Sequence, residues 1–210
     1  VNGVENGLFE EMDEAGKVIW RGYYRSGKRY ADWSDRIVCR EGDLERGEFY
    51  ELDENGKVCE LSVYEKGVKS RVIARFDASA MTEYDSNGVR VYKGGFEGDV
   101  KNGIVRSGKG VEYSSESKTA IYSGEWKDGK REGLGTEYSQ GYAVYTGEWK
   151  NGKRNGSGKE MDENGNVVFV GEWKDGKGKG KEMDGNGNVI YEGEWSDGKR
   201  NGKGEEKMEK

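Results

Sequence analysis

The residues of this chain that could do chemistry are carboxylates, two cysteines, and lysines set among glycines. The sequence contains no histidine, so the commonest general base and metal ligand is missing. This excludes Ser/His/Asp and Cys/His nucleophilic sites and Cys₂His₂ zinc within the chain, and two cysteines cannot form a Cys₄ site. Carboxylates are abundant, but we expect nearly all of them in turns or on exposed strand faces. We therefore expect a non-enzyme with no catalytic residue, no metal and no cofactor.

Two acidic segments, residues 162–166 and 184–188, are similar to calcium-binding loops. An EF-hand loop needs Gly at position six and Glu at position twelve. Here Gly stands at position four, and the twelfth residues are Trp173 and Trp195. The interpretation as turns is therefore favoured over calcium binding.

The segment Gly176-Lys-Gly-Lys-Gly180 is faintly similar to a phosphate-binding loop. It lacks the strand–loop–helix context that such a loop needs. Compared with residues 152–158, it is the same turn with two residues deleted, and we favour that interpretation.

The elements that position these residues are defined by a repeated signature. Gly-Glu-Trp-Lys begins at Gly124, Gly147 and Gly171, and Gly-Glu-Trp-Ser begins at Gly193, with spacings of 23, 24 and 22 residues. A fixed period in this range is typical of a repeat array. Glycines and aromatics that could suggest a binding motif are then parts of a structural unit.

Each repeat unit is predicted to be an antiparallel hairpin. Tyr145, Gly147 and Trp149 are two residues apart and share one face of a strand. The following Asn-Gly at 151–152 indicates a type I′ turn, and Asp-Gly occupies this place in the sister units. In the second strand, Gly-Ser-Gly at 156–158 indicates a bulge or a close backbone approach. The chain is therefore predicted to be a meander of hairpins.

The pattern continues upstream in weaker form. Residues 12–29 align with residues 183–200 without a gap. We predict one continuous array of about seven to eight hairpins, with degenerate units and insertions in residues 1–110 and regular repeats in residues 111–210. The first residues match the tip of a hairpin, which predicts that further residues precede them in the native protein.

Composition excludes several classes of function. The net charge is −6, and neither half of the chain is basic, so we expect no nucleic-acid partner. Four lysines in residues 171–184 are cancelled by four carboxylates, which argues against bulk attraction to anionic lipid. The chain has 36 Gly and no Pro, which suits a structure made almost entirely of strands. Cys39 and Cys59 are expected to be free thiols in a reducing compartment, with a disulfide as the alternative.

The signature Tyr-x-Gly-Glu-Trp-x-(Asp/Asn)-Gly-Lys-x-x-Gly-x-Gly resembles the MORN repeat (membrane occupation and recognition nexus). Residues 122–135, 145–158 and 191–204 match it nearly fully, and residues 169–180 match with a two-residue deletion. The resemblance implies an all-β fold: an elongated, twisted, single-layer antiparallel meander of stacked hairpins. It also implies a scaffold or adaptor that binds proteins through a groove or a terminal hairpin, and that can dimerise.

Our leading hypothesis is a non-enzymatic scaffold for protein–protein interaction, located in the cytoplasm or peripherally at membranes or the cytoskeleton. The alternatives are a peripheral binder of phosphoinositide headgroups, and a regulatory segment of a larger enzyme. A homodimer is a further expectation. Insertions in the irregular half are expected to contact partners at Trp33, Cys39 and Met81. The structural residues that line a candidate groove are Tyr122, Gly124, Trp126, Tyr145, Gly147, Trp149, Phe169, Gly171, Trp173, Tyr191, Gly193 and Trp195.

Overall fold

The structure, a computed structural model, is built from β-strands. It describes residues 7–16, 18–25, 28–32, 37–42, 46–53, 55, 57–65, 68–99, 102–196 and 199–207. Every regular element in these ranges is a strand. The chain forms two compact units, one of residues 1–90 with 97–104 and the other of residues 91–96 with 105–210.

The first unit contains eight of the strands. In chain order they are β1 (Gly7–Met12), β2 (Val18–Arg25), β3 (Lys28–Asp32), β4 (Ile37–Gly42), β5 (Arg46–Leu52), β6 (Val58–Glu65), β7 (Val68–Phe76) and β8 (Met81–Tyr84). The strands β1 to β3 form a three-stranded sheet of their own. Each neighbouring pair from β4 to β8 is antiparallel.

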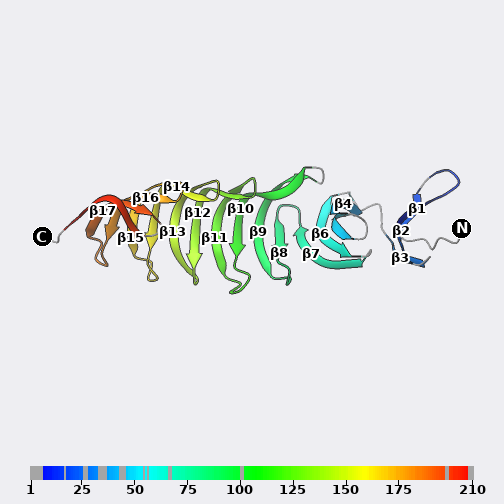
Figure 1. The fold of residues 1–210 in the computed structure, drawn as a ribbon, viewed down its shortest axis with the longest axis horizontal. Helices are drawn as coiled ribbons and strands as arrows, with labels where there is room; N and C mark the ends of the chain where they lie inside the picture. The colour runs from blue at the N-terminus through cyan, green and yellow to red at the C-terminus, as the bar shows by residue number, and fades with distance from the viewer. Residues whose placement is uncertain are drawn as a thin grey trace. The chain divides into compact units, whose positions relative to one another are not determined.

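The second unit contains the regular repeats. Its strands are β9 (Arg90–Asp99), β10 (Gly103–Tyr113), β11 (Ala120–Lys127), β12 (Lys130–Ser139), β13 (Tyr142–Lys150), β14 (Lys153–Met161), β15 (Val167–Lys174), β16 (Lys177–Met183), β17 (Val189–Ser196) and β18 (Lys199–Glu206). Strands that are neighbours in the chain are neighbours in the sheet (Figure 1).

The hydrogen-bonded order runs without a crossover from β4 to β18, which makes one open sheet of 15 strands. The predicted all-β fold, a single-layer antiparallel meander of about seven hairpins, is confirmed. The aligned segments 12–29 and 183–200 also share their register where they are described. Met12 pairs with Val18 and Met183 with Val189, each directly after a β-bulge.

The tight turns have the predicted type I′ geometry. Both Asn151 and Gly152 have positive φ, 51° and 81°, as a two-residue hairpin of this type requires. The same pair of positive φ values occurs at 128–129 and 175–176, whereas the fourth predicted turn, at 197–198, lies outside the described residues. A further turn of this kind, at Gln140–Gly141, was not predicted, because Gln is not among the residues that favour this conformation.

The longer turns are closed by an aspartate. Asp162 Oδ1 accepts hydrogen bonds from the backbone N–H groups of Asn164 and Asn166, at 2.9 and 2.8 Å. Hydrogen bonds from Asn166 hold the pKa of the Asp162 carboxyl below its ordinary value. Asp184 repeats the arrangement. These carboxylates cap their own turns, as the interpretation of these segments as turns predicts.

Candidate functional site

One face of the second unit carries a row of interlocked aromatic rings. Successive rings contact edge to face, with centroids 5.2–5.8 Å apart. Tyr122 and Tyr145 are fully buried, and Trp149 is 5% exposed. Such pairs contribute about 0.5–1.5 kcal/mol each beyond the area that they bury. In sequence order, the row comprises Tyr92, Tyr122, Trp126, Tyr145, Trp149, Phe169, Trp173, Tyr191 and Trp195.

The glycine between the two rings of each signature is required by space. Tyr145 lies across Gly147 and its cross-strand partner Gly158. A Cβ on Gly147 would stand 2.5 Å from the Tyr145 hydroxyl and 2.6 Å from Gly158 Cα. The hydroxyl donates a hydrogen bond to the carbonyl of Glu148, at 3.2 Å. The signature glycines Gly124, Gly171 and Gly193 are enclosed in the same way.

The glutamate of the signature closes the bulge of the opposite strand. Gly156 has a φ of 81°, and a Cβ there would stand 2.7 Å from the Glu148 carboxylate. Glu148 Oε1 accepts a hydrogen bond from Ser157 N at 3.1 Å. Gly-Glu-Trp therefore supplies ring space, a bulge cap and a ring in three successive residues.

The tryptophans differ in how their indole N–H groups are satisfied. Trp126 donates to the Gly110 carbonyl at 3.3 Å, and Trp149 donates to the Gly135 carbonyl at 3.2 Å. The indole nitrogens of Trp173 and Trp195 are buried and have no acceptor among the described residues.

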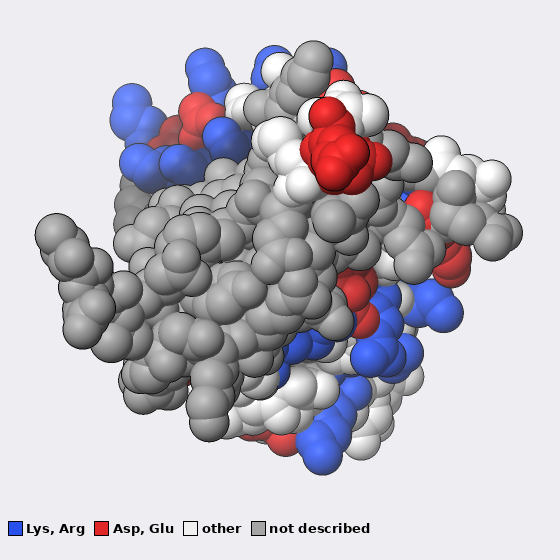
Figure 2. Space-filling view, turned by 90° about the vertical axis from the view of Figure 1, so that its right-hand side faces the viewer, with Lys and Arg blue, Asp and Glu red and all other residues white. Residues whose placement is uncertain are grey.

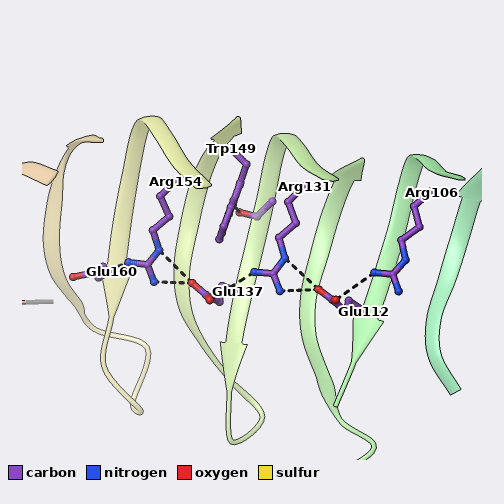
Figure 3. Close-up of polar contacts among 8 residues, drawn as sticks. Arg106, Glu112, Arg131, Glu137, Trp149, Arg154 and Glu160 are labelled. Atoms are coloured by element: carbon purple, nitrogen blue, oxygen red, sulfur yellow. Dashed lines mark hydrogen bonds and ion pairs between the residues drawn. The ribbon is translucent and has the colours of Figure 1, made fainter. Parts of the chain in front are cut away.

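A chain of arginines and glutamates crosses the same face (Figure 3). The Arg131 guanidinium lies 4.5 Å from the Tyr122 ring centroid and 5.2 Å from that of Trp149. It pairs with Glu112 at 2.7 Å on one side and with Glu137 at 3.7 Å on the other. The Arg131 guanidinium thus covers two rings and links two carboxylates.

The arrangement repeats in the neighbouring hairpins. Arg154 lies 4.3 Å from the Tyr145 centroid and bridges Glu137 and Glu160. Arg106 covers Tyr92, and Arg200 covers Tyr191. These arginines were missed at the level of sequence. The signal was present, because Arg131, Arg154 and Arg200 each follow a turn glycine by two residues.

The shortened hairpin of residues 169–180 differs from its sisters as its deletion predicts. Its strands pair without a bulge, so that Gly178 stands opposite Trp173. In the preceding hairpin, Arg154 stands opposite Trp149. The deletion therefore removes an arginine from the ring face.

A groove of about 490 Å³ lies on this face between two hairpin tips. Both signs of charge line it, with Arg131 and Arg154 on one hand and Glu137 and Glu160 on the other. The remaining lining residues are Trp149, Gly152, Lys153, Trp173 and Gly176. A surface of indoles, guanidiniums and carboxylates can bind polypeptide, and Trp and Arg are enriched at the centres of protein interfaces.

In the first unit, the β6–β7 hairpin carries charges where the repeats carry rings. Tyr64 pairs with Lys69 in the way that Trp149 pairs with Arg154. Two residues before each signature glycine the repeats have an aromatic ring, whereas Glu60 stands two residues before Ser62.

Glu60 is the centre of this polar network. It accepts hydrogen bonds from Ser62 and Lys69, both at 2.7 Å, and from Arg75 at 3.1 Å. Burial alone would raise the pKa of Glu60, but these donors hold it below its ordinary value. Lys69 also pairs with Glu51, which accepts a hydrogen bond from the Tyr64 hydroxyl at 3.0 Å. Burial and this hydrogen bond raise the pKa of Tyr64 to about 12.

The expected partner contacts of the irregular half are placed as follows. Trp33 lies outside the described residues, and Cys39 lies on β4, where the backbone alone is described. Met81 begins β8, pairs with Phe76 and is 3% exposed. The structure gives Met81 a place in the core, and contact of these residues with a partner stays a prediction.

The part of the chain that the structure describes has neither a metal-binding cluster nor a helix that could span a membrane. It contains no group of three or more His, Cys, Asp or Glu that could hold a metal ion. In the same part, we find no helix of the length and apolarity needed to cross a membrane.

Fold and site together define a β-hairpin repeat protein whose period is carried by a Tyr-x-Gly-Glu-Trp signature. The family model of the MORN repeat matches residues 122–142, 145–167, 169–189 and 191–208. Residues 122–208 are therefore MORN repeats, and the matched segments contain every ring of the row except Tyr92. MORN repeats are a non-catalytic repeat family. No curated protein matches the chain.

Proposed function

We propose that this chain is a non-enzymatic scaffold that binds a protein partner. The observation that carries the proposal is the groove on the ring face, where Trp149 and Trp173 lie beside Arg131, Arg154 and two glutamates. Its floor is stiffened by the ring row and by the chain of ion pairs. A pre-organised surface loses little conformational entropy on binding, which favours affinity.

Lys153 offers a direct test of this groove. It lines the groove, is exposed, and forms no ion pair within the part of the chain that the structure describes. Lys130 occupies the same position one hairpin earlier and does not line the groove, so it is a matched control. We expect Lys153→Glu to reduce the yield of a cross-linked partner, identified by mass spectrometry, and Lys130→Glu to leave it unchanged. Equal yields from both variants and the parent chain would overturn the assignment of the groove.

A second candidate function is binding of an anionic lipid headgroup. A groove of about 480 Å³ near the C-terminal strands is lined by Lys179, Lys203 and Lys207. Glu192 and Glu205 line it as well, which weakens the field that an anion would meet. On a different face, the one that Figure 2 draws, Lys and Arg side chains likewise lie close to Asp and Glu side chains among the described residues. Flotation with phosphoinositide vesicles tests this function, and Lys179→Glu with Lys203→Glu should abolish any binding seen.

The third role considered, a regulatory segment of a larger enzyme, stays a prediction that the full reading frame decides. We also propose a cytoplasmic location, peripheral attachment to membranes or the cytoskeleton, and homodimerisation. Light scattering at several concentrations would test dimerisation, since a dimer that dissociates on dilution changes its mean mass.

A further inference from the structure

The chain of arginines and glutamates is interrupted at one ring. Tyr122, Tyr145 and Tyr191 each stand directly between two glutamates of the neighbouring strands. Tyr122 stands between Glu112 and Glu137, and Tyr191 stands between Glu182 and Glu206. At the deleted hairpin, Phe169 stands between Glu160 and Glu182 in the same register. No guanidinium of the described chain links that last pair of carboxylates.

The interruption leaves two half-paired carboxylates. Glu137 gives one oxygen to Arg131 and the other to Arg154. Among the described residues, in contrast, Glu160 pairs with Arg154 alone, and Glu182 pairs with Arg200 alone. Their side chains are 18% and 22% exposed, so each is held in a partly dehydrated place with one oxygen still able to accept a hydrogen bond.

The Phe169 ring also lies between two tryptophans that differ from the others of the row. Phe169 is flanked by Trp173 and Trp195, with centroids 5.4 and 5.2 Å away. These are the two tryptophans whose buried indole N–H groups have no acceptor among the described residues. Trp173 is 4% exposed and lines the groove together with Glu160. In the sister hairpins the same nitrogen donates to a backbone carbonyl of the preceding strand, so the two unsatisfied indoles mark a local change of packing on either side of Phe169.

We infer that the gap at Phe169 is a receptor for an arginine of a partner polypeptide, bound between Glu160 and Glu182. The chemistry is that of the sister positions, where a guanidinium of the chain itself bridges the two carboxylates. The Trp173 and Trp195 indoles flank Phe169 and report on a guanidinium bound beside it. The inference rests on the proposed function, and it adds the chemical class of the partner: a basic segment with a central arginine.

The contact is with the carboxylates rather than with the phenyl ring. Phe169 is 1% exposed, because Trp173 and Trp195 pack against it and Gly178 between them is buried. Arginine is preferred over lysine, because its planar fork can serve two carboxylates at once.

The indole N–H resonances of the labelled whole chain provide the test. The probe is the peptide acetyl-Gly-Gly-Arg-Gly-Gly-amide, and its matched control carries citrulline, which has nearly the same shape without the charge. We expect the arginine peptide to shift the Trp173 and Trp195 resonances and to leave those of Trp126 and Trp149 in place. The citrulline peptide should bind at least about tenfold more weakly, since charged hydrogen bonds are about twice as strong as neutral ones.

Two variants separate the receptor from a general effect. Inserting Arg-Asn between Lys177 and Gly178 restores the Gly-Lys-Arg-Asn-Gly sequence of residues 152–156 and supplies the guanidinium internally. This insertion should abolish the response to the peptide and raise the melting temperature. Glu112→Gln alters a carboxylate that already has two arginine partners, and should leave the response intact.

The outcomes distinguish this inference from the proposed function. No shift at Trp173 and Trp195, or an equal response to the citrulline peptide, would overturn the receptor. An undiminished response in the insertion variant would do the same. Either result leaves the scaffold function standing if Lys153→Glu still reduces partner yield. If no partner is captured by the parent chain, the scaffold function fails even where the peptide binds.

Discussion

The two units of this chain support the same kind of hairpin with different side chains. In the second unit, Tyr145 and Trp149 lock into a row of rings, and Arg154 covers them. In the first unit, Glu60 takes the place of the ring and Lys69 the place of the arginine. Aromatic packing also occurs there, in the edge-to-face pair Phe49–Tyr64 with centroids 5.4 Å apart.

The antiparallel hairpin is common to both units, whereas the side chains that stabilise it differ. The antiparallel pairing continues through both units, so the ring row is one way of supporting the hairpins and a polar network is another. The polar network is the more exacting of the two, because each of its half-buried charges needs every partner in place. We therefore expect the second unit to depend on the ring row, and the β6–β7 hairpin of the first to depend on hydrogen-bonded charge as well as on its buried Leu61 and Tyr64.

The largest effect is expected from removing a ring of the row. Trp149→Ala should lower the free energy of unfolding of the second unit by about 3–5 kcal/mol, because it leaves a cavity between Tyr122 and Tyr145. Chemical denaturation followed by the remaining tryptophans measures this loss. Tyr142, which is 51% exposed, is the control, and Tyr142→Ala should cost about 0.5 kcal/mol or less. Equal losses from the two variants would mean that the row contributes little.

The next effect tests the space between the rings. Gly147→Ala should cost about 1–3 kcal/mol, because the new Cβ meets the Tyr145 hydroxyl and the Gly158 backbone. At Gly152, a Cβ would meet no atom within 4 Å, so Gly152→Ala should cost about 1 kcal/mol, for its positive φ alone. Thermal unfolding of both variants measures the difference, and a Gly152→Ala loss as large as that of Gly147→Ala would contradict the crowding argument. Ser62 occupies the matching place of the first unit, where Glu60 stands at the position of the tyrosine and accepts the Ser62 hydrogen bond.

Removal of one carboxylate charge should destabilise the first unit more than the second. Glu60→Gln weakens a network in which three donors share one carboxylate, and should cost about 1–3 kcal/mol. Glu137→Gln weakens two ion pairs, but the rings beneath remain, and we expect about 1–2 kcal/mol. Denaturant titrations at low and high salt measure both losses. A greater loss from Glu137→Gln would reverse the assignment of charge to the first unit and packing to the second.

Acid provides the smallest and most selective test. The pKa of Glu60 is lowered in the folded chain, so its contribution to stability is present above its unfolded pKa and is lost as pH falls through the folded value. The first unit should therefore lose stability below about pH 4.5 more steeply in the parent chain than in Glu60→Gln. Melting temperatures from pH 6 to pH 3 measure this, and parallel curves for the two proteins would contradict it.

Much of the fold could be predicted from the sequence because it depends on local signals. Asn151–Gly152 fixes a turn by its φ preference, and Tyr145, Gly147 and Trp149 share a face by the alternation of a strand. The charged chain could not be predicted in this way, since Arg154 meets Glu137 from another hairpin and only the register brings them together. The sequence showed the gap at Phe169 only as a two-residue deletion. The structure was needed to show that the deletion leaves Glu160 and Glu182 on either side without an arginine between them.

Hydrogen exchange of the whole chain tests most directly whether different kinds of side chain stabilise the two units. Trp149→Ala should increase backbone exchange in β11 to β15 and leave β5 to β7 unchanged, whereas Glu60→Gln should do the reverse. Repeats contact mainly their neighbours, so each loss should stay near its source. If both variants increased exchange equally in both sets of strands, the distinction between ring support and charge support would be wrong.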